Sequence, residues 1–84
     1  NGNYIFAKLV NSHWIPIFIG QGDLAVQTDI DNHHQGDCIR SKGATHIHVH
    51  LNLREKDRTD EEYDLLDNYT MAYKPLGCND KTDG

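Results

Sequence analysis

The stretch that decides the fold is NYIFAKLVNSHWIPIFIG, residues 3–20, in which two apolar runs flank a short polar connection. Aromatic and aliphatic residues of this kind favour β-strands. The connection is the three residues 11–13, a length typical of hairpins. The sequence therefore predicts an antiparallel hairpin with strands over residues 3–10 and 14–19.

Strand alternation sorts the side chains of this hairpin onto two faces. If Val10 pairs with Trp14, Tyr4 lies opposite Gly20 and close to Phe18 on one face. The other face is wholly aliphatic, so we expect it to be the core face; it carries Ile5, Ala7, Leu9, Ile15, Ile17 and Ile19.

Weaker patterns follow the hairpin. Asp23 predicts a short helix over about 24–32, and Asp37 predicts another that ends at Lys42 and Gly43. The motif Thr59-Asp-Glu-Glu62 has the form of a capping box and predicts a longer helix from Thr59. The polar end of the chain, about residues 76–84, is expected to be mobile.

The clearest strand pattern is ATHIHVHLN, residues 44–52. Its alternation places His46, His48 and His50 on one face, which we expect to be the face that bears Tyr4. Alternate histidines on a strand also bind zinc in proteins, so a zinc-binding domain is one reading of this segment. A polar sheet face without metal is the other.

Size and composition limit the classes of function. Eighty-four residues with 37% hydrophobic side chains can form one small domain, residues 1–84. The formal charge of −5 disfavours non-specific binding of nucleic acid, because few cations are available to neutralise phosphates. We interpret Cys38 and Cys78 as free thiols and expect a cytoplasmic location without a membrane span.

The ordered motifs together resemble the GIY-YIG nuclease domain, especially its small bacterial stand-alone members. The resemblance is carried by GNY at residues 2–4, FIG at 18–20, the His33-His34 pair, and then GATHIHVH, EEYDLL and YKPLGCN. It covers nearly the whole chain. It implies an α/β (α+β) fold in which helices flank a three-stranded antiparallel sheet.

The resemblance also implies a function and a site. Nucleases of this family cut the phosphodiesters of nucleic acid with one divalent cation, Mg²⁺ or Mn²⁺, so DNA is the implied partner. Glu62 takes the place of the metal ligand, and Tyr4 that of the tyrosine that activates water. Gln27 stands where the catalytic arginine is expected. The implied substrate-binding residues are Phe18, Gly20, Gln21, His33, His34, Arg40 and His46.

Two departures from the family pattern predict weak or lost catalysis. Gln27 is neutral and cannot balance the charge of a phosphoryl-transfer transition state, and Phe18 lacks the hydroxyl of the second tyrosine. Each matched residue also has a structural reading, in which Tyr4 only packs in the sheet and Glu62 only caps a helix. A non-catalytic module that binds nucleic acid or protein therefore stays open beside the endonuclease.

Overall fold

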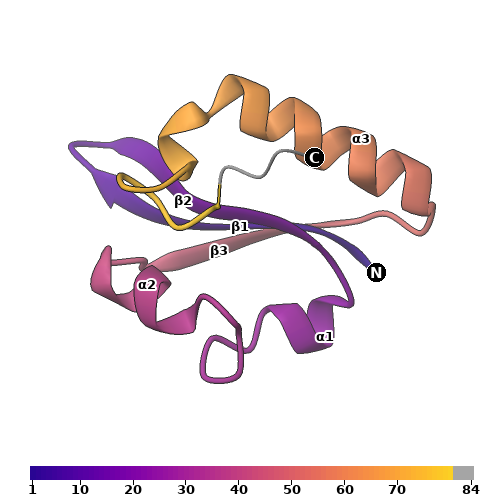
Figure 1. The fold of residues 1–84 in the computed structure, drawn as a ribbon, viewed down its shortest axis with the longest axis horizontal. Coiled ribbons are helices and arrows are strands. Elements are labelled where there is room, and N and C mark those ends of the chain that lie inside the picture. The colour runs from indigo at the N-terminus through magenta and orange to yellow at the C-terminus, as the bar shows by residue number, and fades with distance from the viewer. Residues whose placement is uncertain (81–84) are drawn as a thin grey trace.

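The computed structural model describes residues 1–80 and has the predicted fold class, an α+β domain around a three-stranded antiparallel sheet (Figure 1). The strands are β1, Gly2–Val10, β2, His13–Gly22, and β3, His46–Leu51. Their spatial order is β2-β1-β3, so the first strand of the hairpin is the centre of the sheet. Within the described residues, no helix combines the length and apolarity needed to cross a bilayer.

The hairpin closes one residue earlier than expected. Asn11 and Ser12 form the turn with φ values of 51° and 66°, the left-handed geometry that matches the twist of a two-residue hairpin. Val10 therefore pairs with His13, and the predicted pairing of Val10 with Trp14 is wrong. An irregularity between Phe6 and Ala7 restores the expected register, so that Tyr4 does pair with Gly20 and Phe6 with Phe18.

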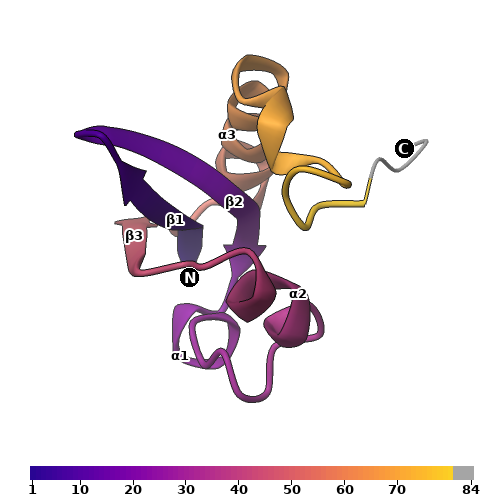
Figure 2. The same ribbon diagram turned by 90° about the vertical axis from the view of Figure 1, so that its left-hand side faces the viewer.

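Both faces of the sheet are covered by helices (Figures 1 and 2). The short helices α1, Leu24–Gln27, and α2, Gly36–Ser41, lie on one side, and α3, Glu55–Asn68, lies on the other. The expectation of a single aliphatic core face is therefore wrong, because aromatic side chains form a second core. That core consists of Tyr4, Phe6, Ile17, Phe18, Ile39 and Cys78, whereas Ile19, Leu66 and Ala72 form the buried cluster under α3.

The histidines of β3 lie on the α3 side of the sheet. Directly paired residues share a face, and β1 pairs Tyr4 with Val49 and Ile5 with His48. His46, His48 and His50 are thus on the face opposite Tyr4, and our prediction that they share its face is wrong. Alternation within β3 fixes which residues go together, but it does not reveal which face they join.

The helix boundaries differ most from the sequence expectations. The side chain of Asp23 caps α1 as predicted, accepting from the backbone N–H of Ala25 at 3.0 Å, but this helix ends at Gln27. Helix α3 begins four residues before Thr59, with Arg54 at the N-cap. Glu62 therefore lies inside the helix, where it does not serve a capping box. A 3₁₀ turn, Thr70–Ala72 (η1), follows α3.

The segment after η1 is tied to the outer edge of β2. Cys78 is fully buried and forms a disulfide with Cys38 of α2, so the interpretation of two free thiols is wrong. The Asn79 side chain accepts from Ile19 N at 2.8 Å and donates to Ile19 O at 2.9 Å. The predicted mobile end is thus bonded at Cys78 and Asn79, and residues 81–84 lie outside the described residues.

Reduction of the disulfide is expected to destabilise the domain strongly. The bridge joins residues 40 positions apart, and closing a loop of that length stabilises a protein by about 2–4 kcal/mol. Urea unfolding with and without dithiothreitol measures the difference. The Cys38→Ser/Cys78→Ser variant is the control, because its stability should be low and should not respond to the reductant. Wild-type stability that is equal in both conditions would contradict the bridge.

Candidate functional site

The centre of the candidate site is the ring of Tyr4, which passes directly against the backbone of Gly20. Tyr4 comes from β1 and is 2% exposed. A Cβ atom at position 20 would lie only 2.7 Å from Tyr4 Cε1 and closer still to the hydroxyl end of the ring. Glycine is therefore required here for space. It lets the tyrosine ring reach from β1 past β2 toward the outer edge of the sheet.

A chain of hydrogen bonds orients the Tyr4 hydroxyl. The backbone N–H of Gln35 donates to His33 Nδ1 at 3.0 Å, so a neutral His33 carries its proton on Nε2. That Nε2–H donates to Tyr4 Oη at 2.7 Å. The Tyr4 hydroxyl in turn donates to Gln27 Oε1 at 3.3 Å. Side chains from β1, from the end of α1 and from the loop before α2 thus meet at one oxygen atom.

The protonation states of this chain follow from its surroundings. Burial, with a smaller contribution from the Glu62 carboxylate, raises the pKa of Tyr4 well above its ordinary value. Burial also lowers the pKa of His33, and the adjacent His34 lowers it further. At neutral pH both groups are therefore uncharged, with Tyr4 protonated and His33 neutral.

Aromatic rings separate the Tyr4 hydroxyl from solvent. Phe18 stacks on Tyr4 with ring centroids 6.0 Å apart and meets His33 edge-on at 4.8 Å. His34 stacks on His33 at 4.5 Å and is itself exposed. Phe18 and His34, both expected substrate-binding residues, thus form the boundary between the buried hydroxyl and the surface.

Outside this boundary lies a pocket of about 370 Å³ between α3, the loop before α2 and the C-terminal segment. Glu62 projects into it from α3, and Phe18 and His34 line the opposite side. Burial raises the pKa of Glu62, since within residues 1–80 no hydrogen bond or ion pair compensates for its lost hydration. The remaining polar lining comes from Gln35, Tyr63, Asp67, Tyr73, Asn79 and Asp80.

Three of the predicted site residues point elsewhere. Gln21 turns to the α3 side of the sheet, where its Oε1 accepts from Arg58 Nε at 3.2 Å. Arg40 forms an ion pair with Asp31 on the surface. His46 lies on the opposite sheet face from Tyr4. No substitute for the missing arginine is therefore found at these positions.

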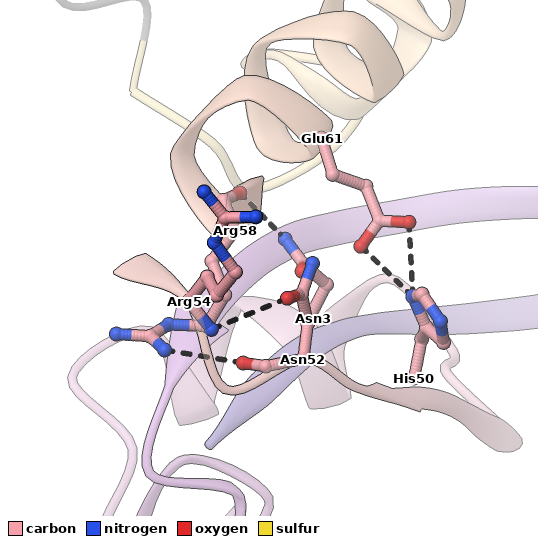
Figure 3. A network of polar contacts seen from close by, with 6 residues as sticks. All are labelled: Asn3, His50, Asn52, Arg54, Arg58 and Glu61. Atoms are coloured by element: carbon pink, nitrogen blue, oxygen red, sulfur yellow. Dashed lines mark hydrogen bonds and ion pairs between the residues drawn. The ribbon is translucent and has the colours of Figure 1, made fainter. Parts of the chain in front are cut away.

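Figure 3 shows how the start of α3 is attached to the sheet on that opposite face. Asn3 donates to the backbone oxygen of Arg58 at 2.9 Å, and Arg58 donates to the backbone oxygen of Asn52 at 3.1 Å. One turn later, His50 Nδ1 contacts both oxygens of Glu61 at 3.0 and 3.1 Å. The Glu61 carboxylate is therefore paired with His50, whereas the next residue, Glu62, faces the pocket.

The histidine strand does not form a zinc site among the described residues. Trp14 meets the rings of His46 and His48 edge-on, with centroid distances of 4.8 and 4.7 Å. These contacts direct both imidazoles toward an indole ring. Residues 1–80 contain no cluster of three or more His, Cys, Asp or Glu side chains placed to hold a metal ion.

The C-terminal part of the pocket was not expected from the sequence as part of a site. Tyr73, Asn79 and Asp80 reach it because the segment is held against β2 by the disulfide and by Asn79. The two cysteines were the sequence feature that could have indicated this position of the C-terminal segment. Read as a bridge, they would have placed the end of the chain beside α2, close to His33 and His34.

The chain matches no family model, no curated protein and no solved structure. Roles for Tyr4, His33 and Glu62 therefore have to be inferred from their own geometry and chemistry.

The neutral His33 is expected to make the domain sensitive to acid. An unfolded histidine has a pKa near 6.5, and burial lowers this value in the fold. Below about pH 6.5 the unfolded chain therefore binds more protons, so stability falls with falling pH, by at most about 1.4 kcal/mol per pH unit for one group. His33→Gln should reduce this slope between pH 7 and pH 5 in urea unfolding. A matched variant, His13→Gln in the exposed hairpin, should keep it, and identical slopes for His33→Gln and wild type would contradict the assignment.

Proposed function

We propose that this chain is a metal-dependent phosphodiesterase of the GIY-YIG type that acts on nucleic acid with low activity. One observation carries the proposal: three residues matched by the resemblance, Tyr4, Gln27 and His33, meet at one hydroxyl, and the charge of a fourth, Glu62, acts on that hydroxyl from the neighbouring pocket. A purely structural role for Tyr4 does not require both a histidine and an amide bonded to its hydroxyl.

The pocket residues fit a single hard divalent cation. Mg²⁺ and Mn²⁺ prefer oxygen ligands and are commonly held by one or two carboxylates, with water and substrate phosphate completing the coordination. Glu62, a carboxylate without a protein partner among residues 1–80, would hold the ion, alone or with Asp67; Asp80 also lines the pocket but is paired with Lys74 at 2.9 Å. When bound, the ion would polarise the phosphoryl oxygen and stabilise the charge that develops there.

The side chains of Tyr4 and His34 have different roles in the proposed reaction. Tyr4 is protonated and donates to Gln27, so it cannot accept a proton from water in this arrangement. It acts as a positioning residue that fixes the Gln27 amide. His34 is the exposed imidazole that reaches the pocket, and an unprotonated ring nitrogen there can accept a proton from an attacking water.

Low activity follows from the charges around the pocket. Its lining includes Glu62, Asp67 and Asp80 but no Lys or Arg of the described residues, and Lys74, which pairs with Asp80 at 2.9 Å, is already neutralised by that carboxylate. A transition state with charge spread over phosphate oxygens therefore lacks a fixed cation, and loss of such a donor costs about 10²–10³ in rate. The acidic surroundings also repel the substrate unless a divalent cation binds.

A non-catalytic binding module is the second candidate, and the burial of Tyr4 favours it. Tyr4 is 2% exposed and does not line the pocket that contains Glu62. A substrate in the pocket would contact Phe18 and His34 first. Such a module would keep the stability and shape of the site without turnover.

The expected cytoplasmic location also needs revision. Two free thiols suggested the cytoplasm, but the Cys38–Cys78 bridge favours a compartment in which disulfides persist. A location outside the reducing cytoplasm is therefore our proposal, with nucleic acid as the partner.

Glu62 and Glu61 provide a matched pair for testing the metal site. In chelator, Glu62→Gln should be as stable as wild type or slightly more so, because burial disfavours the charged carboxylate. In Mn²⁺ at about 100 times its Kd, the wild type should gain about 2.7 kcal/mol, and Glu62→Gln should gain almost nothing. Thermal unfolding measures both effects. Glu61→Gln should keep the full gain, and its loss there would show that the wrong carboxylate has been assigned.

Gln27→Arg is expected to raise the rate of DNA cleavage in Mn²⁺ by about 10²-fold, because it places a cation where the resemblance expects the catalytic arginine, at a side chain that is only partly buried. Cleavage of a fluorescently labelled oligonucleotide measures the rate. Gln21→Arg is the control, since position 21 faces the other side of the sheet and should leave the rate unchanged. Fast cleavage by the wild type, or equal rates for both arginine variants, would argue against the missing cation as the cause of low activity.

A further inference from the structure

A second pocket, of about 240 Å³, lies on the α3 side of the sheet near the hairpin. Ile5, Ala7 and Leu65 contribute aliphatic surface to it, and it is bordered by the aromatic rings of Trp14 and Tyr69 and the imidazole of His48. No Lys, Arg, Asp or Glu among residues 1–80 lines it. The lining therefore offers no ionic partner to a charged ligand.

Trp14 is held in place although it is 46% exposed. It belongs to β2, yet its indole reaches across the central strand to the β3 histidines, and the small side chain of Ala7 lies in its path. Edge-on contacts with His46 and His48 fix the plane of the ring. Tyr69, which is 42% exposed, also keeps much of its ring open to solvent. A large aromatic surface that is rigid before binding loses little conformational entropy when a ligand stacks on it.

We propose that this pocket binds a planar nucleobase, which stacks on Trp14 and forms a hydrogen bond with the His48 imidazole. The assignment rests on the proposed function, since the base would belong to an unpaired strand of the nucleic-acid substrate. Bases present a flat π-surface and polar edges, which suit an aromatic border with one imidazole.

The distance between the two sites supports a strand, not a single nucleotide, as the ligand. Trp14 lies roughly 20 Å along β2 from Gly20, so a strand several nucleotides long is needed to contact both Trp14 and the Tyr4 site.

Fluorescence of Trp14, the single tryptophan of the chain, gives a direct test in chelator, where no cleavage occurs. A single-stranded oligothymidylate should quench the emission with saturation, and thymidine monophosphate should do so more weakly. Binding of a labelled oligonucleotide, followed by anisotropy, should weaken about tenfold in Trp14→Leu and in Tyr69→Leu. Leu53→Ser, at an exposed apolar residue outside the pocket, should bind as the wild type does.

The outcomes separate this proposal from the proposed catalytic function. Equal affinity of Trp14→Leu and wild type for the oligonucleotide would overturn the pocket assignment, provided that thermal unfolding shows both to be folded. If thymidine monophosphate quenched the emission and the oligothymidylate did not, the assignment of a nucleic-acid strand as the ligand would be overturned. Glu62→Gln should bind the oligonucleotide normally in chelator, so loss of Mn²⁺-dependent activity in that variant would leave the base pocket intact.

Discussion

The contact between the Tyr4 ring and the bare backbone of Gly20 is the constraint on which the candidate site depends. A tyrosine on a central strand usually ends beneath its own sheet. Here the missing side chain at position 20 lets the hydroxyl end of the ring lie against β2, where His33 and Gln27 bond to it and the Glu62 charge acts on it. The strand does not turn at this glycine, because β2 stays paired with β1 as far as Gly22. Space for an aromatic ring, more than backbone flexibility, selects the residue.

Because helices cover both faces of the sheet, side chains from both sides reach the outer edge of β2. Helix α3 carries Glu62 from one side, and the loop before α2 carries His33 and His34 from the other (Figure 2). The Cys38–Cys78 bridge and the Asn79 side chain then hold the C-terminal segment along β2. The pocket is therefore a junction of three segments at the outer edge of one strand. Its stability depends on a covalent bond as well as on packing, as expected for a chain with a small core.

The sequence predicted the fold class, the hairpin and its pairing at the site, because alternation and turn residues are local signals. It placed the β3 histidines on the wrong face of the sheet. The face depends on the register between β3 and β1, which the alternation within β3 does not determine. The start of α3 was misplaced because Thr59 and Glu62 imitate a capping box inside a helix that begins at Glu55. The resemblance named Tyr4, Gln27 and His33, whose side chains are hydrogen-bonded together, whereas no pattern showed that Gln21 and Arg40 would turn to Arg58 and Asp31. The disulfide required a pairing that two isolated cysteines do not specify.

A double-mutant cycle between positions 4 and 20 tests the central contact most directly. If the Tyr4 ring fills the space beside Gly20, Gly20→Ala should lower the free energy of unfolding by about 1–3 kcal/mol in the wild type, as overpacking does. In a Tyr4→Ala background the same change should cost less than about 0.5 kcal/mol, so the two positions would be coupled. Equal costs in both backgrounds, measured by urea unfolding, would contradict the placement of the tyrosine and with it the site built around its hydroxyl.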